Sequence, residues 1–333
     1  MILGGDITSA LTSFAGLGLA LILEGDGAQR VRLGWTDEAE PRLEVSAEDY
    51  DDDAIAAVVH RHAQAAAAPG AWIHTDLEGE PWNGTSAVFS PRVKAAATSE
   101  QWHELQRLRH DGIDRVARQE SAADLIGALG EPAYWRFADK EMKKPRPDEG
   151  ANRWEMKTRN RGEDFVTNRL RSLAQIVSAR TDERVATGLR GQTLIDEAYK
   201  GKRSEESRTP TGLTPPRFTD SALAWCALWG IASFPVIHRL RQPSVTAGAV
   251  PVGQFTPECL VLPVIVGGVS LERWRALLVS RQLVMAKDPQ ERGPRAWLRS
   301  HGARALAVFP LHVSDNPNAP ERSLGAGRIE VLA

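Results

Sequence analysis

Basic and aromatic side chains alternate in one part of this chain, a combination that suits a nucleic-acid backbone with bases that can stack. Residues 136–217 contain 19 Lys and Arg against 13 Asp and Glu, whereas residues 1–100 contain 6 against 16. Cations neutralise phosphates, and aromatic rings stack on bases. A solvated basic loop is the alternative interpretation. The predicted contacts are phosphate contacts from Lys140, Lys143, Lys144, Arg146, Arg153, Lys157, Arg159 and Arg161, further ones from Arg203, Arg208 and Arg217, and base stacking by Trp154.

Signatures of catalysis are weak. The sequence contains no P-loop, no dinucleotide-binding glycine motif after a strand and no G-x-S-x-G. His60 and His62 lie two residues apart on an expected helix, so they project from nearly opposite faces and cannot share a metal. His110-Asp111 is a lone dipeptide without companion ligands. The sequence therefore predicts no catalytic residue, no metal, no cofactor and no enzymatic activity.

Composition indicates a globular protein. The 333 residues are 42% hydrophobic and include two cysteines, Cys226 and Cys259, both in apolar runs. Two cysteines exclude a disulfide framework and a cysteine-rich zinc module. The apolar run Leu17–Leu23 is too short to span a membrane, and no basic residue precedes it, which argues against a secretory signal. We expect a soluble, cytoplasmic protein without a membrane partner.

The pattern of apolar residues, caps and turns predicts a helix-rich α+β chain with short strands and a long basic loop. Gly16 and Gly18 lower the helix propensity of the first helix, so they indicate close backbone packing at a central position. Alternation over Arg30–Trp35 predicts a strand that pairs with Pro41–Val45. Strands are also expected over Ser244–Val250 and Ala305–Pro310. Helices are expected from Asp6 or Thr8 to Glu24, over Ala54–Ala68, over Glu100–Gln119 with Ser99 as cap, over Ala122–Leu129, Phe165–Ala179, Leu271–Arg281, and over Ser221–Ser233 capped by Thr219 or Asp220.

Apolar periodicity is nearly absent over residues 136–163, which we interpret as a long loop that is ordered only with a partner. Residues 199–218 form a second basic segment rich in Gly, Pro and Ser. The predicted organisation is an N-terminal α+β part with an acidic face (1–135), a basic, loop-rich region with one amphipathic helix (136–217), and a C-terminal α+β part (218–333). The first and last parts can form one domain.

Two stretches resemble a known family. Residues 9–24 (SALTSFAGLGLALILE), followed by residues 32–42 (RLGWTDEAEPR), and residues 208–235 (RTPTGLTPPRFTDSALAWCALWGIASFP) resemble Csb-type subunits of type I-G (formerly I-U) CRISPR–Cas effector complexes. The resemblance implies a non-catalytic subunit of a crRNA-guided antiviral surveillance complex. Its partners would be crRNA, target DNA or both, together with neighbouring subunits. The two stretches carry no catalytic signature, so no catalytic residue is transferred.

Two other functions stay open from the sequence. A metal-free nuclease or RNA-processing enzyme needs only a His or Tyr with Lys or Arg, so the missing motifs do not exclude it. A scaffold whose basic segment binds an acidic protein is the third interpretation. Salt-dependent RNA binding by the isolated chain argues against that scaffold, and cleavage of RNA in the presence of a chelator would indicate the enzyme.

Overall fold

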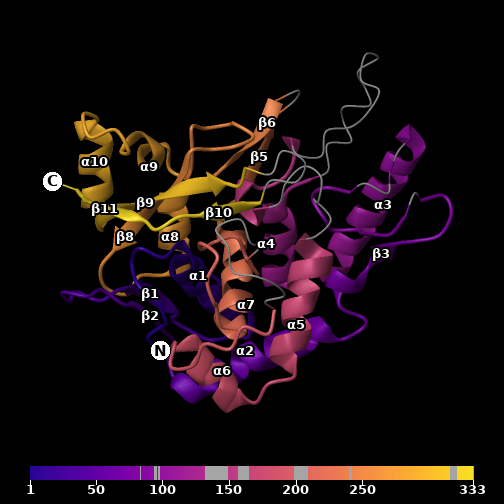
Figure 1. Ribbon diagram of the computed structural model, residues 1–333, viewed down its shortest axis with the longest axis horizontal. Coiled ribbons are helices and arrows are strands. Elements are labelled where there is room, and N and C mark those ends of the chain that lie inside the picture. Colours follow the sequence, from indigo (N-terminus) through magenta and orange to yellow (C-terminus); the bar gives the residue numbers. More distant parts are fainter. Residues whose placement is uncertain are drawn as a thin grey trace.

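Two apolar helices that lie more than 190 residues apart in the sequence pack against each other at the centre of the molecule (Figure 1). They are α1 (Ala10–Gly25) and α7 (Ser221–Gly230), and both are buried along nearly their whole length. This computed structural model describes residues 1–82, 84–93, 96, 98–131, 149–156, 165–198, 209–239, 242–315 and 321–332. Within that part of the chain, the expected helix-rich α+β fold is confirmed.

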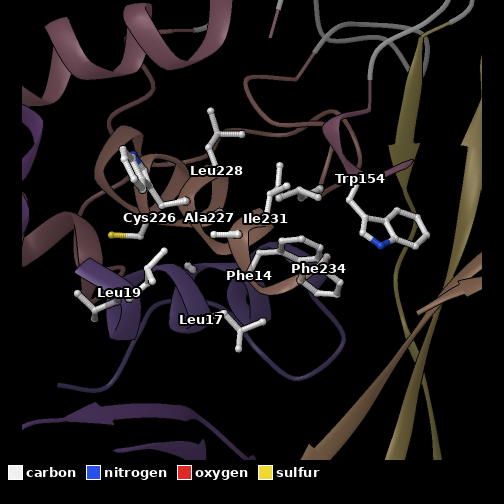
Figure 2. Packing of buried hydrophobic residues seen from close by; sticks show 14 of the residues in the cluster. Phe14, Leu17, Leu19, Trp154, Cys226, Ala227, Leu228, Ile231 and Phe234 are labelled. Atoms are coloured by element: carbon white, nitrogen blue, oxygen red, sulfur yellow. The ribbon is translucent and has the colours of Figure 1, made fainter. Parts of the chain in front are cut away.

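Glycine allows the two central backbones to touch. A Cβ atom at Gly18 would overlap the carbonyl oxygen of Cys226, and one at Gly230 would overlap that of Phe14. Only glycine lets the backbones approach this closely. Phe14 also stacks on Phe234 with ring centroids 4.4 Å apart, and apolar side chains from both helices close the core around them (Figure 2). The expected central position of the first helix is confirmed.

Further helices surround this pair. α2 contacts α5, α6 and α1, while α4 contacts α1 on one side and α3 on another. The predicted amphipathic helix after residue 164 begins with a π-helical turn, η6 (Phe165–Leu170), before α5 continues it. The other described helices are α2 (Asp52–Ala67), η1 (Trp72–His74), α3 (Ser99–Val116), α4 (Glu120–Leu129), η4 (Arg153–Glu155), α5 (Arg171–Ser178), α6 (Asp182–Leu189), η7 (Ile231–Ser233), α8 (Leu271–Leu278), α9 (Arg281–Met285) and α10 (Arg292–Ser300).

The strands form small antiparallel sheets. The largest described sheet has five strands, in which the fully buried β8 lies beside β9, and β9 carries both β10 and β11 on its other side. The predicted hairpin is confirmed as β1–β2, with Leu33 opposite Val45. The described strands are β1 (Arg32–Trp35), β2 (Leu43–Ser46), β3 (Asp76–Leu77), β4 (Ser86–Ala87), β5 (Val236–Arg239), β6 (Gln242–Thr246), β7 (Ala249–Val250), β8 (Cys259–Ile265), β9 (Ala303–Val313), β10 (Arg322–Leu324) and β11 (Arg328–Val331).

The described parts of all three predicted segments contribute to one hydrophobic cluster. α5 and α6 of the middle segment pack on α2 of the first, and α7 of the last packs on α1. The described residues of segments 1–135, 136–217 and 218–333 therefore do not form separate cores.

The structure identifies the N-cap residues of α7 and α3. Asp220 caps α7 by accepting from the Ala222 N–H at 2.8 Å, as one of the two expected candidates. For α3, the cap is Thr98 and not Ser99, because Thr98 and Gln101 form a reciprocal capping box.

Candidate nucleic-acid interface

Most of the predicted phosphate contacts lie outside the described residues. The structure describes Arg153, Trp154 and Arg217 from the predicted set. The predicted residues outside the described part are Lys140, Lys143, Lys144, Arg146, Lys157, Arg159, Arg161, Arg203 and Arg208.

Trp154 cannot serve as the predicted stacking residue in this conformation. Its side chain is fully buried, and its indole N–H donates to the Ala247 carbonyl oxygen at 2.8 Å. A base stacks only on an exposed ring face, and Trp154 has none. This expectation was wrong because basic neighbours in the sequence do not reveal whether an aromatic ring is exposed.

Arg153 is also corrected, since it lies in the interior at 3% exposure. Its guanidinium donates to the carbonyl oxygens of Ala151 and Phe255 and to the Ser244 hydroxyl, at 2.7 to 3.2 Å. These acceptors use the N–H groups that a phosphate would need. Arg153 therefore joins the chain to the β5–β6 region instead of binding a ligand.

The interior position of Arg153 and Trp154 extends to the whole described stretch 149–156. Glu155 is fully buried and forms an ion pair with the equally buried Arg92. Arg169 donates to the Glu155 carbonyl oxygen at 2.9 Å. The expectation of a loop over 136–163 that orders only with a partner is wrong for this stretch, because its polar groups find partners within the chain.

Arg217 is the exposed member of the predicted set among the described residues. Its guanidinium donates to the Ser9 hydroxyl at 3.1 Å, beside the start of α1. A single hydrogen bond to a neutral hydroxyl leaves other N–H groups of the guanidinium for a phosphate. Arg217 remains compatible with the predicted role.

A second group of exposed basic residues, which sequence reasoning missed, lies on α8, α9 and α10 and at the start of β9, elements labelled in Figure 1. Residues 271–304 contain eight Lys or Arg against three Asp or Glu. We call the exposed arginines of this stretch that have no ion pair with a described residue the α8–α10 arginine surface. They are Arg273, Arg281, Arg292, Arg299 and Arg304.

Each of these helices turns an apolar side inward and thereby places its arginines outward. Leu271, Trp274, Leu283 and Leu298 are buried, and the Trp274 indole N–H donates to the Leu33 carbonyl oxygen at 3.2 Å. On α10, Arg292 and Arg299 lie seven residues apart and share one face. The anchored apolar sides fix which side chains face solvent.

The positions of two of these arginines do not stabilise their helices. Arg281 is the first residue of α9, and Arg292 is the first residue of α10. The N-terminal end of a helix carries partial positive charge, so a cation there is unfavourable. Other basic residues nearby do have structural partners: Arg275 pairs with Asp124 at 2.7 Å, and Arg295 donates to the Ala286 and Val331 carbonyl oxygens.

An aromatic pair accompanies the α8–α10 arginine surface. The rings of Trp297 and His301 stack with centroids 3.9 Å apart and an interplanar angle of 23°. His301 is exposed, and its carbonyl oxygen accepts from Arg273 at 2.8 Å. Exposed cations next to a stacked aromatic pair are the two components that single-strand binding requires. The sequence signal for this surface is the basic excess over residues 271–304, which lies beyond the segment 136–217 that charge had singled out.

The histidine and cysteine side chains described next have structural roles within the fold. His60 bonds Asp182 at 2.5 Å and so links α2 to α6. Burial raises the pKa of both thiols, Cys226 and Cys259, which keeps them protonated. Across the described ranges, no group of three His, Cys, Asp or Glu side chains is placed to hold a metal ion.

None of the helices that the structure describes combines the length and the hydropathy required to cross a bilayer. Comparison of the chain with protein-family models and with curated proteins yields no match.

Proposed function

We propose that this protein is a non-catalytic subunit of a crRNA-guided antiviral complex that binds the backbone of guide RNA or target DNA. The observation that carries the nucleic-acid part is the α8–α10 arginine surface with its five exposed arginines, together with the Trp297–His301 stack that Arg273 contacts at the His301 carbonyl oxygen. The assignment to a crRNA-guided complex is supported by the resemblance of residues 9–24, 32–42 and 208–235 to Csb-type subunits.

Arginines without carboxylate partners favour phosphate binding for a physical reason. An arginine already paired with a carboxylate must give up that pair before it binds a phosphate, whereas an unpaired one releases only water and counterions. The planar guanidinium matches the geometry of phosphate oxygens. An exposed arginine surface thus gives sequence-independent affinity, as required of a subunit in a complex where base pairing reads the sequence.

The acidic face of the N-terminal part supports a place within an assembly. Asp37, Glu38 and Glu40 are exposed in the β1–β2 turn, and Asp51 and Asp53 are exposed at the start of α2. A nucleic-acid backbone is repelled from such a face, whereas a basic neighbouring subunit is attracted to it. We infer that the two faces separate roles, with nucleic acid on α8–α10 and a basic subunit on the acidic face, in a cytoplasmic assembly.

The test compares two triple variants that remove the same charge. Arg281→Gln, Arg292→Gln and Arg299→Gln together remove three members of the α8–α10 arginine surface. The control is Arg30→Gln, Arg61→Gln and Arg107→Gln, because these exposed arginines are already paired with Glu48, Asp26 and Glu104. Binding of a fluorescent single-stranded RNA is followed by anisotropy at constant salt.

The first triple variant should weaken binding by about tenfold or more, and the control should change it by less than about threefold. Equal weakening by both would indicate that net charge alone determines binding, and the proposed surface would be wrong. Cleavage of the RNA by the wild-type protein in the same tubes, with chelator present, would contradict the non-catalytic assignment.

A further inference from the structure

A cavity of about 700 Å³ lies where α1, α2, α3, α4 and α7 meet, and no residue of the α8–α10 arginine surface lines it. Its volume falls within the usual range for small-molecule sites. Its wall combines aromatic, titratable and basic side chains, which include Glu24, His62, Trp72, Phe89, Arg115 and Trp229. The proposed backbone-binding function uses none of them.

Aromatic rings form much of the cavity wall. Trp72 meets Phe89 edge to face with centroids 5.5 Å apart, and it meets Trp229 in the same way at 6.4 Å. The His62 ring lies against Trp229 at 4.4 Å. Phe89 and Trp229 are buried, whereas Trp72 is partly exposed, so the Trp72 ring is the one that a planar ligand can stack on. A flat, unsaturated ring system is the ligand shape that such walls favour.

The wall also offers specific hydrogen-bonding groups. His62 Nδ1 accepts from the Trp225 indole N–H at 3.2 Å, so the neutral imidazole carries its proton on Nε2. Burial lowers the pKa of His62 to about 4, which keeps the ring neutral at physiological pH. Trp229 is 2% exposed, and its indole N–H has no acceptor among the described residues. A buried donor without an acceptor is costly unless a ligand or water supplies one.

Glu24 adds a carboxyl group to the same wall. Burial is the main reason why its pKa rises to about 7, with help from the carboxylates of Glu272 and Asp124 and against the effect of Arg275. A carboxyl that titrates near neutrality can both donate and accept hydrogen bonds. The edge of a heterocyclic base carries both hydrogen-bond donors and acceptors. His62, Trp229 and Glu24 can therefore form hydrogen bonds with that edge.

Two arginines at the cavity can bind an anionic group attached to the ring of the ligand. Arg115 and Arg118 both line the cavity, are exposed, and form no ion pair with any described residue. α4 begins beside them without a side-chain cap. The two arginines favour a phosphate over a neutral substituent, and Ser121 in the first turn of α4 also lines the cavity.

We propose that the cavity between α1, α2, α3, α4 and α7 binds one nucleotide, with the base stacked on Trp72, an acceptor atom of the base at the Trp229 indole N–H, and the phosphate at Arg115 and Arg118. The nucleotide can be a free monophosphate or one residue of a bound strand, since both present the same chemistry. The proposal goes beyond the backbone-binding function and does not depend on the α8–α10 arginine surface.

The test measures binding of AMP, GMP, CMP and UMP to the full chain by calorimetry, and each nucleoside without phosphate serves as a comparison. Ala65 lines the cavity and is exposed on α2, so Ala65→Trp places an indole in the cavity without altering the core. The matched control is Gln64→Trp, on the neighbouring exposed position of α2, which does not line the cavity. Trp72→Ala removes one wall.

At least one monophosphate should bind with a Kd below about 1 mM and more tightly than its nucleoside. Ala65→Trp should weaken it by about tenfold or more. Trp72→Ala should weaken it by roughly 5- to 150-fold, as expected for loss of one stacking partner. Gln64→Trp should leave it unchanged. Displacement of the bound monophosphate by single-stranded RNA identifies a strand nucleotide as the natural occupant, and absence of displacement identifies a free one.

Two results overturn the proposal: no monophosphate binds at roughly millimolar concentration, or the Ala65→Trp protein binds as well as the wild type. Neither result affects the RNA affinity attributed to Arg281, Arg292 and Arg299, so failure of this proposal and failure of the proposed function are distinguishable.

Discussion

The arginines of the interior and those of α8–α10 are chemically identical but have different partners. Five interior arginines are only 1 to 5% exposed: Arg92, Arg109, Arg153, Arg169 and Arg180. They donate to backbone carbonyl oxygens or pair with carboxylates of the same chain, as Arg109 does with the Val88 carbonyl oxygen and Glu131. The arginines of the α8–α10 surface have no ion pair with a described residue.

The contrast teaches that local charge density does not identify a binding surface. Arg153 lies in the segment with the densest run of basic residues, yet its guanidinium satisfies carbonyl oxygens as far away as Phe255. A buried charge is costly unless hydrogen bonds or an opposite charge stabilise it, so an interior arginine has such partners within the chain. An exposed arginine is solvated by water and is free to bind a ligand. Substitutions in the two regions should therefore have different consequences.

The largest effect is expected inside. Asp220 pairs with Arg180 at 2.8 Å and caps α7, and both residues are buried. Asp220→Ala leaves the guanidinium of Arg180 without one carboxylate, so the free energy of unfolding should fall by about 3–5 kcal/mol. Arg299→Ala on the surface should change it by less than about 0.5 kcal/mol. Urea unfolding of both variants measures the difference, and similar losses would contradict it.

Glycines should show the same contrast between core and surface at a smaller scale. Gly18→Ala forces a Cβ into the Cys226 carbonyl oxygen and should cost about 1–3 kcal/mol or more. Gly293 lies in α10, and a Cβ added there would meet no atom within 4 Å, so Gly293→Ala should be neutral or stabilise by roughly 0.5–1 kcal/mol. Thermal unfolding compares the two, and a tolerated Gly18→Ala would show that α1 and α7 can separate.

The aromatic pair on α10 should matter for binding more than for stability. Trp297→Ala removes one ring of the stack with His301 and should weaken single-stranded RNA binding by about 1–3 kcal/mol. Trp154→Phe in the interior keeps an apolar ring there and should leave RNA affinity unchanged, although it loses the hydrogen bond to Ala247. Anisotropy titrations decide, and a reversed order of effects would contradict the placement of the binding surface.

The smallest effect is a pH dependence from Glu24. Its pKa is about 7 in the folded chain against 4.5 unfolded, so between those values the folded state holds more protons than the unfolded state. Stability from this group is therefore present at low pH and lost as pH rises from about 4.5 to 7. His62, with its pKa lowered to about 4 from 6.5, acts in the opposite direction below pH 6.5.

Because the two groups oppose each other, the wild-type curve alone is not diagnostic. Glu24→Gln isolates one of them: relative to wild type, the variant should gain stability as pH rises from about 5 to 8. Denaturant unfolding across that range provides the comparison. A stability difference between Glu24→Gln and wild type that stays constant with pH would mean that Glu24 ionises normally.

The sequence predicted elements with a strong local pattern and missed those defined by distant partners. The β1–β2 hairpin and the central α1 follow from alternation and from Gly16 and Gly18, which are local signals. β8 lacks alternation because it is buried on both sides, so its apolar run did not distinguish it from a helix. The predictions for Arg153 and Trp154 were wrong because the residues that they hydrogen-bond, Ser244, Ala247 and Phe255, lie about ninety to a hundred residues away in the sequence.

The most direct measurement of the central claim is the salt dependence of RNA affinity, plotted as log affinity against log salt. Each phosphate contact on a single strand contributes a slope of about 0.7. The Arg281→Gln, Arg292→Gln, Arg299→Gln protein should therefore have a slope about 2 units shallower than wild type, with native circular dichroism. An unchanged slope in that folded variant, with flattening instead in a Lys143→Glu, Lys144→Glu, Arg159→Glu, Arg161→Glu protein, would place the binding surface on the segment first predicted from the sequence and contradict the assignment to α8–α10.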